Sequence, residues 1–220
     1  MTKSASTLAY RLVWLTLQNA GFTQPRVPPP VVDAMHSVNF VQELDSADIE
    51  TLWEIAKSQG YPLVVKTHAA PSAAVIAAFA SGRAIGSASF RDPRDMALSM
   101  LDHGAKARRK DHWAFSEYRT VDDTLDRIRE QCKSLEKWLE LSVLPLKYDD
   151  IAFNGHATVQ KFMDQLGIDG DPADILRQVE DRKYIQFNKG VQDRFKTEML
   201  VSDSNRLSKE FAPLIARLQA

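Results

Sequence analysis

The junction that decides the fold lies in the stretch Arg83-Ala-Ile-Gly-Ser-Ala-Ser-Phe-Arg-Asp-Pro-Arg-Asp-Met-Ala-Leu-Ser99. Its first half, Arg83–Phe90, has the composition of a short, weak strand. Asp92 is suited to cap a helix whose first position is Pro93, and we expect that helix to run through Met100. A strand that leads directly into a capped helix is the unit from which α/β folds are built.

The same alternation of strand and helix continues on both sides of this junction. Upstream, Tyr61–Lys66 is a short apolar run rich in β-branched residues, and an alanine-rich, helix-like stretch separates it from Arg83. Downstream, an amphipathic helix over Val121–Glu140 leads into a second strand-like run, Val143–Tyr148. Strands separated by helices predict an α/β fold with a central parallel sheet flanked by helices.

Several further helices are marked by their caps and by apolar residues at helical spacing. Gly21 and Gly167 are placed to end two of them, and Asp45 or Ser46 to cap another. The predicted helices cover Ser6–Asn19, Ser46–Ser58, His156–Leu166 and Asn205–Leu218. The chain contains no internal repeat, so we expect one domain over residues 1–220.

The composition narrows the classes of function. A chain of 220 residues with 44% hydrophobic content can bury one substantial core, and a formal net charge of −1 gives no indication of a nucleic-acid or membrane-surface partner. The single cysteine, Cys132, favours a reducing compartment, and no motif has metal-ligand spacing. Since no run of apolar residues approaches a membrane span and no secretory signal opens the chain, we expect a cytoplasmic protein.

The first candidate anion site is the segment Thr2-Lys-Ser-Ala-Ser-Thr7, which directly precedes a predicted helix. Backbone N–H groups at a helix N-terminus favour a negative charge, and Lys3, Ser6 and Thr7 add side-chain donors. The alternative is an ordinary amino terminus with a hydroxyl cap, since the glycine pattern of a Walker loop is absent.

A second candidate, Lys66-Thr-His68, follows the Tyr61–Lys66 run, so it is expected at the carboxyl end of a strand, where open α/β folds bind ligands. A histidine there can accept a proton near neutral pH, although the same letters fit a surface histidine.

The third candidate segment follows the predicted strand Arg83–Phe90 and opens the helix that begins at Pro93. Arg91 precedes this helix, and Ser99 lies about two turns along it. The planar fork of an arginine matches the oxygens of a phosphate monoester. Arg94 and Asp95 are better read as surface charges.

In this order the segments resemble the sulfotransferases that use 3′-phosphoadenosine-5′-phosphosulfate (PAPS), which have a P-loop-type α/β fold. The stretch Thr2–Leu8 is similar to the family's phosphosulfate loop, P-K-S-G-T-T-W, and Lys66–His68 to its K-T-H segment. The R-x-P-x-D-x-x-x-S element is matched within Phe90–Ser99. Leu146–Asp150 resembles the Y-E-D segment, and Asn188–Lys196 a degenerate form of the R-K-G-x-x-G-x-W-K loop.

The resemblance implies binding roles for residues across the chain. The 5′-phosphosulfate would be held by Lys3, Ser4, Ala5, Ser6 and Thr7. The 3′-phosphate would be held by Arg91, Ser99, Lys189 and Gly190, with Tyr148 near the adenine. Adenosine 3′,5′-bisphosphate would be the product, and no metal is implied.

The resemblance also implies a catalytic set. His68 would take the proton of the acceptor hydroxyl, Lys3 would neutralise charge on the leaving oxygen, and Lys66 would assist electrostatically. The acceptor would be a small molecule or a carbohydrate. The sequence does not identify it, because the family's acceptor pockets are built from variable segments.

The sequence departs from the family pattern in several places. Ala5 and Leu8 stand where the loop usually has glycine and tryptophan, and Asn188 stands where arginine is preferred. The strand that leads into the loop in the family is missing before Thr2, so either the start is truncated or the sheet lacks that strand. An inactive nucleotide-binding or interaction protein of the same fold is therefore the main alternative, and a P-loop kinase a weaker one.

Overall fold

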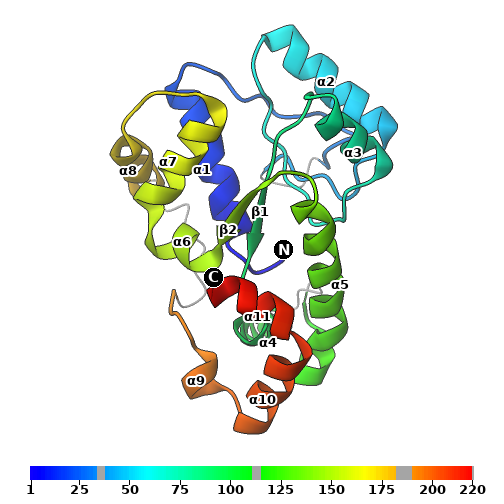
Figure 1. The fold of residues 1–220 in the computed structure, drawn as a ribbon, viewed down its shortest axis with the longest axis vertical. Helices are drawn as coiled ribbons and strands as arrows, with labels where there is room; N and C mark the ends of the chain where they lie inside the picture. Colours follow the sequence, from blue (N-terminus) through cyan, green and yellow to red (C-terminus); the bar gives the residue numbers. More distant parts are fainter. Residues whose placement is uncertain (34–37, 111–114, 182–189, 220) are drawn as a thin grey trace.

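A computed structural model of the protein describes residues 1–33, 38–110, 115–181 and 190–219. This part of the chain is mixed α/β, mostly helical, with a small parallel sheet of two strands (Figure 1). The strands are β1, Ser87–Phe90, and β2, Leu144–Lys147. The helices are α1 (Ser6–Asn19), α2 (Ser46–Gln59), α3 (Ala73–Ala80), α4 (Pro93–Arg109), α5 (Val121–Leu139), α6 (Tyr148–Phe153), α7 (Gly155–Leu166), α8 (Pro172–Asp181), α9 (Phe195–Glu198), α10 (Val201–Glu210) and α11 (Ala212–Gln219).

The two strands pair in register, with Ser87 opposite Leu144 and Phe90 opposite Lys147. Both strands therefore have their carboxyl ends at the same end of the sheet, where α4 and α6 begin. Only the second half of the predicted strand Arg83–Phe90 joins the sheet. Its start is held by α3 instead, since the backbone N–H of Arg83 donates to the carbonyl of Ala78 over 2.9 Å.

The expectation of a strand over Tyr61–Lys66 is wrong for the described chain. The run is extended, but its one bridge joins Lys66 to Phe40, and it does not pair with β1. The side chain of Gln24 takes the place of a strand partner, donating to Pro62 O over 2.9 Å and accepting from Val64 N over 2.9 Å. The described residues thus contain two paired strands where the sequence suggested three.

The caps predicted from the sequence for α2, α4 and α7 are confirmed. Asp45 and Asp48 form a reciprocal capping box at the start of α2, and Asp92 accepts from the N–H of Arg94 at the start of α4. Gly167 ends α7 in the left-handed conformation, with φ 64°. Helix α4 continues to Arg109, well beyond the predicted end at Met100.

The helix expected over Asn205–Leu218 is two helices, α10 and α11, separated at Phe211. Pro213 explains the break, because it has no N–H to donate and its ring clashes with the preceding helical turn.

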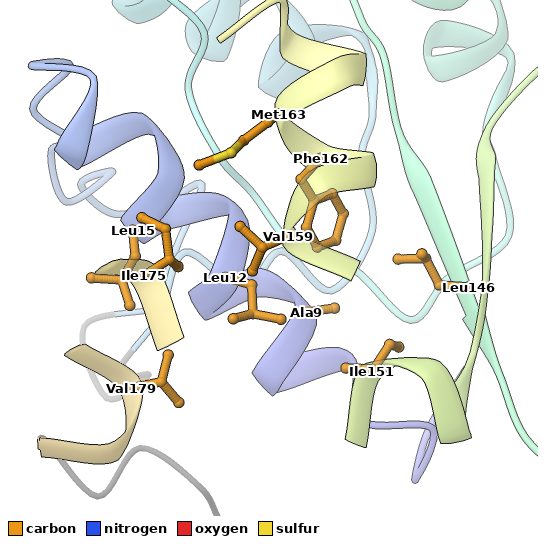
Figure 2. Packing of buried hydrophobic residues seen from close by; sticks show 10 residues of the cluster. All are labelled: Ala9, Leu12, Leu15, Leu146, Ile151, Val159, Phe162, Met163, Ile175 and Val179. Atoms are coloured by element: carbon orange, nitrogen blue, oxygen red, sulfur yellow. The ribbon is translucent and has the colours of Figure 1, made fainter. Parts of the chain in front are cut away.

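The largest buried cluster joins α1 to α7, α8 and β2 (Figure 2). Phe162 of α7 and Leu12 of α1 are almost completely buried and face each other in this cluster. Its members are Ala9, Leu12, Leu15, Leu146, Ile151, Val159, Phe162, Met163, Ile175 and Val179. A second cluster packs α4 against α5 and α10 through Met96, Met100, Ile128 and Leu207.

Two further features of the described chain are the character of its helices and the state of its cysteine. None of its helices combines the length and the apolar character that a membrane crossing requires. Cys132, on α5, is half-buried, and burial raises the pKa of its thiol to about 12.

Candidate functional site

The loop over residues 1–5 approaches α1 with two residues in the left-handed conformation, Lys3 and Ala5, each with φ 61°. Ala5 is the residue before the helix, and among the described residues no side chain caps the first turn of α1. The N–H groups of that turn therefore stay available to an anion. Ala5 stands where the resemblance expects glycine, and the left-handed conformation costs an alanine roughly 1–2 kcal/mol.

The side chain of Ser4 points inward and stabilises this loop. It is fully buried, its Oγ donates to the carbonyl of Met1 over 2.6 Å, and it lies 2.7 Å from the Oγ of Ser89. The predicted ligand role of Ser4 is therefore less well supported than a role in fixing the loop to β1.

Two lysine ammonium groups lie at the start of α1. The Nζ of Lys66 donates to the Oγ1 of Thr7 over 2.8 Å, and the Nζ of Lys3 lies 4.0 Å from the ring centre of Phe115. Burial lowers the pKa of Lys66 to about 8. Burial also lowers the pKa of Lys3 to about 7, with further contributions from the positive charges of Lys66 and Lys106. An anion bound here would be stabilised by both ammonium groups.

The amino group of Met1 lies in the same region. It donates to the carbonyl of Ser89 over 2.8 Å, and burial, followed by the charge of Lys66, lowers its pKa to about 5. Gln131 of α5 connects this loop to the second candidate segment, Lys66–His68: its Oε1 accepts from the N–H of Thr2 over 2.8 Å, and its Nε2 donates to the carbonyl of His68 over 3.3 Å. The two candidate segments are thus held together by one buried side chain.

His68 lies beside these cations with an unusual environment for a base. Its Nδ1 is buried and has no hydrogen-bond partner in the described chain, and its ring centre lies 5.4 Å from that of Phe40. Burial, and then the charge of Lys66, lowers the pKa of His68 to about 2. The imidazole is therefore neutral at physiological pH, and the protein without ligand holds it as a weak base.

Arg91 is 6% exposed and stacks on Tyr148, with its guanidinium carbon 3.7 Å from the ring centre. The parallel register explains this contact, because Arg91 and Tyr148 each follow the last residue of a paired strand. The guanidinium also pairs with Asp95 at 3.4 Å, while its Nε is buried without a partner in the described residues. Arg91 thus retains an unused donor.

Asp95 connects Arg91 to the C-terminal part of the chain. Its Oδ1 accepts from the N–H of Phe195 over 3.1 Å, and burial raises its pKa although the charge of Arg91 lowers it. The interpretation of Asp95 as a surface charge is wrong, since it is 4% exposed. Arg94 is also largely buried and stacks on Phe195, 3.6 Å from the ring centre.

The other residues predicted to hold the 3′-phosphate are Ser99, Lys189 and Gly190. Ser99 is buried in α4, with its carbonyl 2.9 Å from the Nδ1 of His103. Gly190 has a left-handed backbone with φ 63°, and Lys189 lies outside the described residues. Two residues further on, Gln192 hydrogen-bonds the carboxylate of Asp149, so this segment lies near Tyr148.

A cavity of about 270 Å³ opens beside the loop. It is bounded by β1 on one side and by residues 62–69 on the other, and most of its lining is apolar. Met1, Ser6, Lys66 and His68 line it together with these walls. In the described part of the chain, histidine, cysteine and carboxylate side chains form no group of three or more that could hold a metal ion.

Reasoning from the sequence missed Gln131, Ser89 and the amino group of Met1. Gln131 carried a signal, because this polar residue lies three positions after Ile128 and four before Leu135, within the apolar stripe of its helix. Ser89 and Met1 carried none, since their roles depend on contacts between distant parts of the chain.

Neither the comparison with protein-family models nor the search of curated proteins returns a match for this chain. The site is therefore interpreted from its own geometry and from the motif resemblance.

Proposed function

We propose that this protein binds PAPS and transfers its sulfuryl group to the hydroxyl of a small-molecule or carbohydrate acceptor. The observation that carries the proposal is the meeting of Lys3 and Lys66 with the uncapped start of α1. Two half-buried ammonium groups, beside helix N–H groups that no described side chain caps, form a site that matches a compact anion such as a phosphosulfate.

The second phosphate would be read by Arg91. Its stack on Tyr148 and its pair with Asp95 fix the orientation of the guanidinium, and the unpartnered Nε supplies a directed donor. The NH1 of Arg91 lies 3.5 Å from the carbonyl of Lys3, so the two anion-binding segments are neighbours. This spacing supports a donor that carries phosphate groups at both its 5′ and 3′ positions.

In the proposed reaction the acceptor oxygen attacks sulfur while the bond from sulfur to the bridging oxygen of the 5′-phosphate breaks. Lys3 and Lys66 would neutralise the charge that develops on the leaving oxygen. His68 would accept the acceptor's proton. Its low pKa is partly due to neighbouring positive charge, so a bound dianion would raise that pKa toward the range useful for a base.

The proposal extends to the fold. The paired strands β1 and β2 and the extended run over residues 61–66 would belong to a sulfotransferase-type parallel sheet flanked by helices. The common direction of β1 and β2 and the position of the anion-binding segments at their carboxyl ends support this extension.

Calorimetry with adenosine 3′,5′-bisphosphate tests the nucleotide half. Arg91→Lys keeps the charge but loses the fork, and we expect it to weaken binding by about 1.5–3 kcal/mol, or roughly ten- to 150-fold. Arg83→Lys is the matched control, because Arg83 pairs with Glu50 on the surface. Equal affinities for wild type and Arg91→Lys, or equal binding of 5′-AMP and the bisphosphate, would contradict the proposal.

Transfer of labelled sulfate from PAPS to a panel of phenols, alcohols and sugars tests the catalytic half. His68→Ala is expected to lower turnover by about 10²–10⁴-fold while leaving bisphosphate affinity nearly unchanged. His156→Ala, at an exposed position of α7, is the control. Wild-type turnover in His68→Ala would remove His68 from the mechanism.

The low pKa of His68 favours one other candidate, an inactive nucleotide-binding protein of the same fold. Binding of the bisphosphate without turnover of any acceptor would support that candidate. Tight binding of ATP would instead favour a kinase.

A further inference from the structure

The turn over residues 115–118 lies against the candidate anion site. The ring of Phe115 covers the ammonium group of Lys3, with the Nζ 4.0 Å from the ring centre. An ammonium group is attracted to the negative face of an aromatic ring, and the attraction is stronger where less water reaches the pair. Both side chains are half-buried. The contact therefore stabilises the charged form of Lys3 and fixes where its ammonium group lies.

The backbone of this turn is strained at the residue that presents the ring. Phe115 has φ 68°, in the left-handed region that a bulky side chain rarely adopts. The turn is closed by the N–H of Tyr118, which donates to the carbonyl of Phe115 over 3.2 Å. A strained conformation persists only where the surrounding structure holds it. Helix α4 supplies the contacts that do so.

Two residues of α4 hold the turn. A Cβ on Gly104 would lie 2.6 Å from the carbonyl oxygen of Phe115 and 2.5 Å from that of Tyr118, so the turn could not approach a larger residue this closely. One turn further along α4, Arg108 donates to the carbonyls of Ser116 over 2.7 Å and Tyr118 over 2.9 Å. Since glycine is unfavourable inside a helix, the close approach of the turn gives Gly104 its structural role.

Two neighbouring rings surround Phe115. The ring centre of His103 lies 6.0 Å from that of Phe115, and the ring centre of Tyr118 lies 5.9 Å from it. Burial, and then the charge of Lys3, lowers the pKa of His103. His103 is therefore neutral at pH 7, and Lys3 is the cation that the ring of Phe115 holds.

We propose that Phe115 is a positioning residue for Lys3: its ring keeps the ammonium group at the start of α1, and α4 holds the ring in place. A lysine side chain is long and flexible, so it loses conformational entropy when an anion fixes it. Here the ring has already restricted that freedom before the anion arrives. The effect on the anion rests on the proposed function, whereas the contact between Phe115 and Lys3 does not.

A double-mutant cycle on stability tests the contact without a ligand. Phe115→Leu removes the aromatic face and meets the same left-handed backbone, and Lys3→Met removes the charge. Urea denaturation of the wild type, both variants and the double variant should give a coupling of roughly two- to thirtyfold in the folding equilibrium constant, the range for one cation–π pair. Phe22→Leu is the matched control, because the ring of Phe22 stacks on Tyr61, and it should add independently to Lys3→Met.

Calorimetry with adenosine 3′,5′-bisphosphate tests the positioning. Phe115→Leu is expected to weaken binding by roughly three- to thirtyfold, a factor within the side-chain entropy of a lysine, and Phe115→Tyr should keep wild-type affinity because it keeps the ring. Gly104→Ala, which displaces the turn and leaves the ring intact, should weaken binding in the same way. In the Lys3→Met background neither Phe115→Leu nor Gly104→Ala should weaken binding further, because the ammonium group is gone.

Three results would overturn the proposal. The first is an additive stability cycle for Phe115 and Lys3. The second is unchanged or tighter binding in Phe115→Leu, which would make the ring irrelevant to the anion or a competitor of it. The third is an equal loss of affinity with and without Lys3, which would assign the turn a purely structural role. If the wild type binds no bisphosphate, the proposed function fails and the role toward the anion fails with it, and a coupled cycle would support the contact alone.

Discussion

The two edges of β1 differ in how completely they are packed. On the edge that pairs with β2, Phe90 and Leu146 are almost fully buried. Leu146 belongs to the buried cluster around α1 and α7 (Figure 2). On the other edge lies the cavity, and the nearest extended segment makes a single bridge to Phe40. The edge paired with β2, here called the closed edge, is therefore well packed, while the cavity at the other, open edge is lined by Lys66 and His68.

The size of the cavity shows why this difference matters. At about 24 cal/mol per Å³, a closed and empty space of about 270 Å³ in a core would cost about 6 kcal/mol, and this cavity, which is partly open to solvent, costs less. Whole domains are stable by only about 5–15 kcal/mol. Filling the open edge is thus expected to change the stability of the protein more than any single surface contact.

The largest predicted contrast compares two leucines. Leu146→Ala, on the closed edge, should lower the free energy of unfolding by about 2–5 kcal/mol, because the side chain is fully buried. Leu63→Ala, which lines the cavity, should cost less than about 2 kcal/mol, since its side chain is already partly unpacked. Urea denaturation measures both, and equal losses would show that the two edges are packed alike.

A smaller contrast comes from adding volume. Ala97→Val, in the packed cluster beneath α4, should destabilise the protein by about 1–3 kcal/mol through overpacking. Ala78→Val places the same two carbons beside the cavity and should cost about 0.5 kcal/mol, the effect of a β-branched residue in a helix. Thermal unfolding of the pair checks this, and a larger loss for Ala78→Val would argue that the cavity is closed in solution.

A third contrast concerns pH at the cavity. The folded pKa values of Met1 and Lys3, about 5 and about 7, lie below their ordinary values of 8.0 and 10.5. Between each pair of values the unfolded chain binds more protons, so the free energy of unfolding should rise with pH, from about 5 to 8 for Met1 and about 7 to 10.5 for Lys3. Lys3→Met should remove the second rise, whereas Lys209→Met, at an exposed position of α10, should not. An unchanged profile in Lys3→Met would show that Lys3 is solvated.

The same groups give a sign for anion binding. An anion favours the charged form of Lys3, so binding of the bisphosphate should take up protons near pH 7 and weaken as the pH rises above that value. Calorimetry in buffers of different ionisation enthalpy measures this uptake. Proton release on binding would contradict the assignment of Lys3 to the anion.

Local signals predicted the helices well and the sheet poorly. Asp92 with Pro93, Asp45, and Gly167 act within a few residues, and the structure has the caps that these residues predict. The run Tyr61–Lys66 has strand composition, but whether it pairs depends on a neighbour far along the chain, and here Gln24 supplies the hydrogen bonds instead. Local composition carries no information on that choice.

In the candidate site, too, local sequence signals predicted some features, and contacts between distant parts of the chain decided the others. The sequence placed Arg91 after one predicted strand and Tyr148 at the end of another, and the register brings the two residues into contact. It could not show that Ser4 is turned inward to Ser89, or that His68 is buried among cations, because those facts depend on the packing of α5 against the amino-terminal loop.

The lone thiol of α5 provides a way to follow this region over time. With its pKa raised to about 12, Cys132 has almost no thiolate at neutral pH in the folded protein. Alkylation by iodoacetamide must then wait for α5 to separate from its neighbours, so the labelling rate measures how often that happens. Cys132 follows Gln131, which holds the amino-terminal loop. The labelling rate of Cys132 therefore reports how often the site opens.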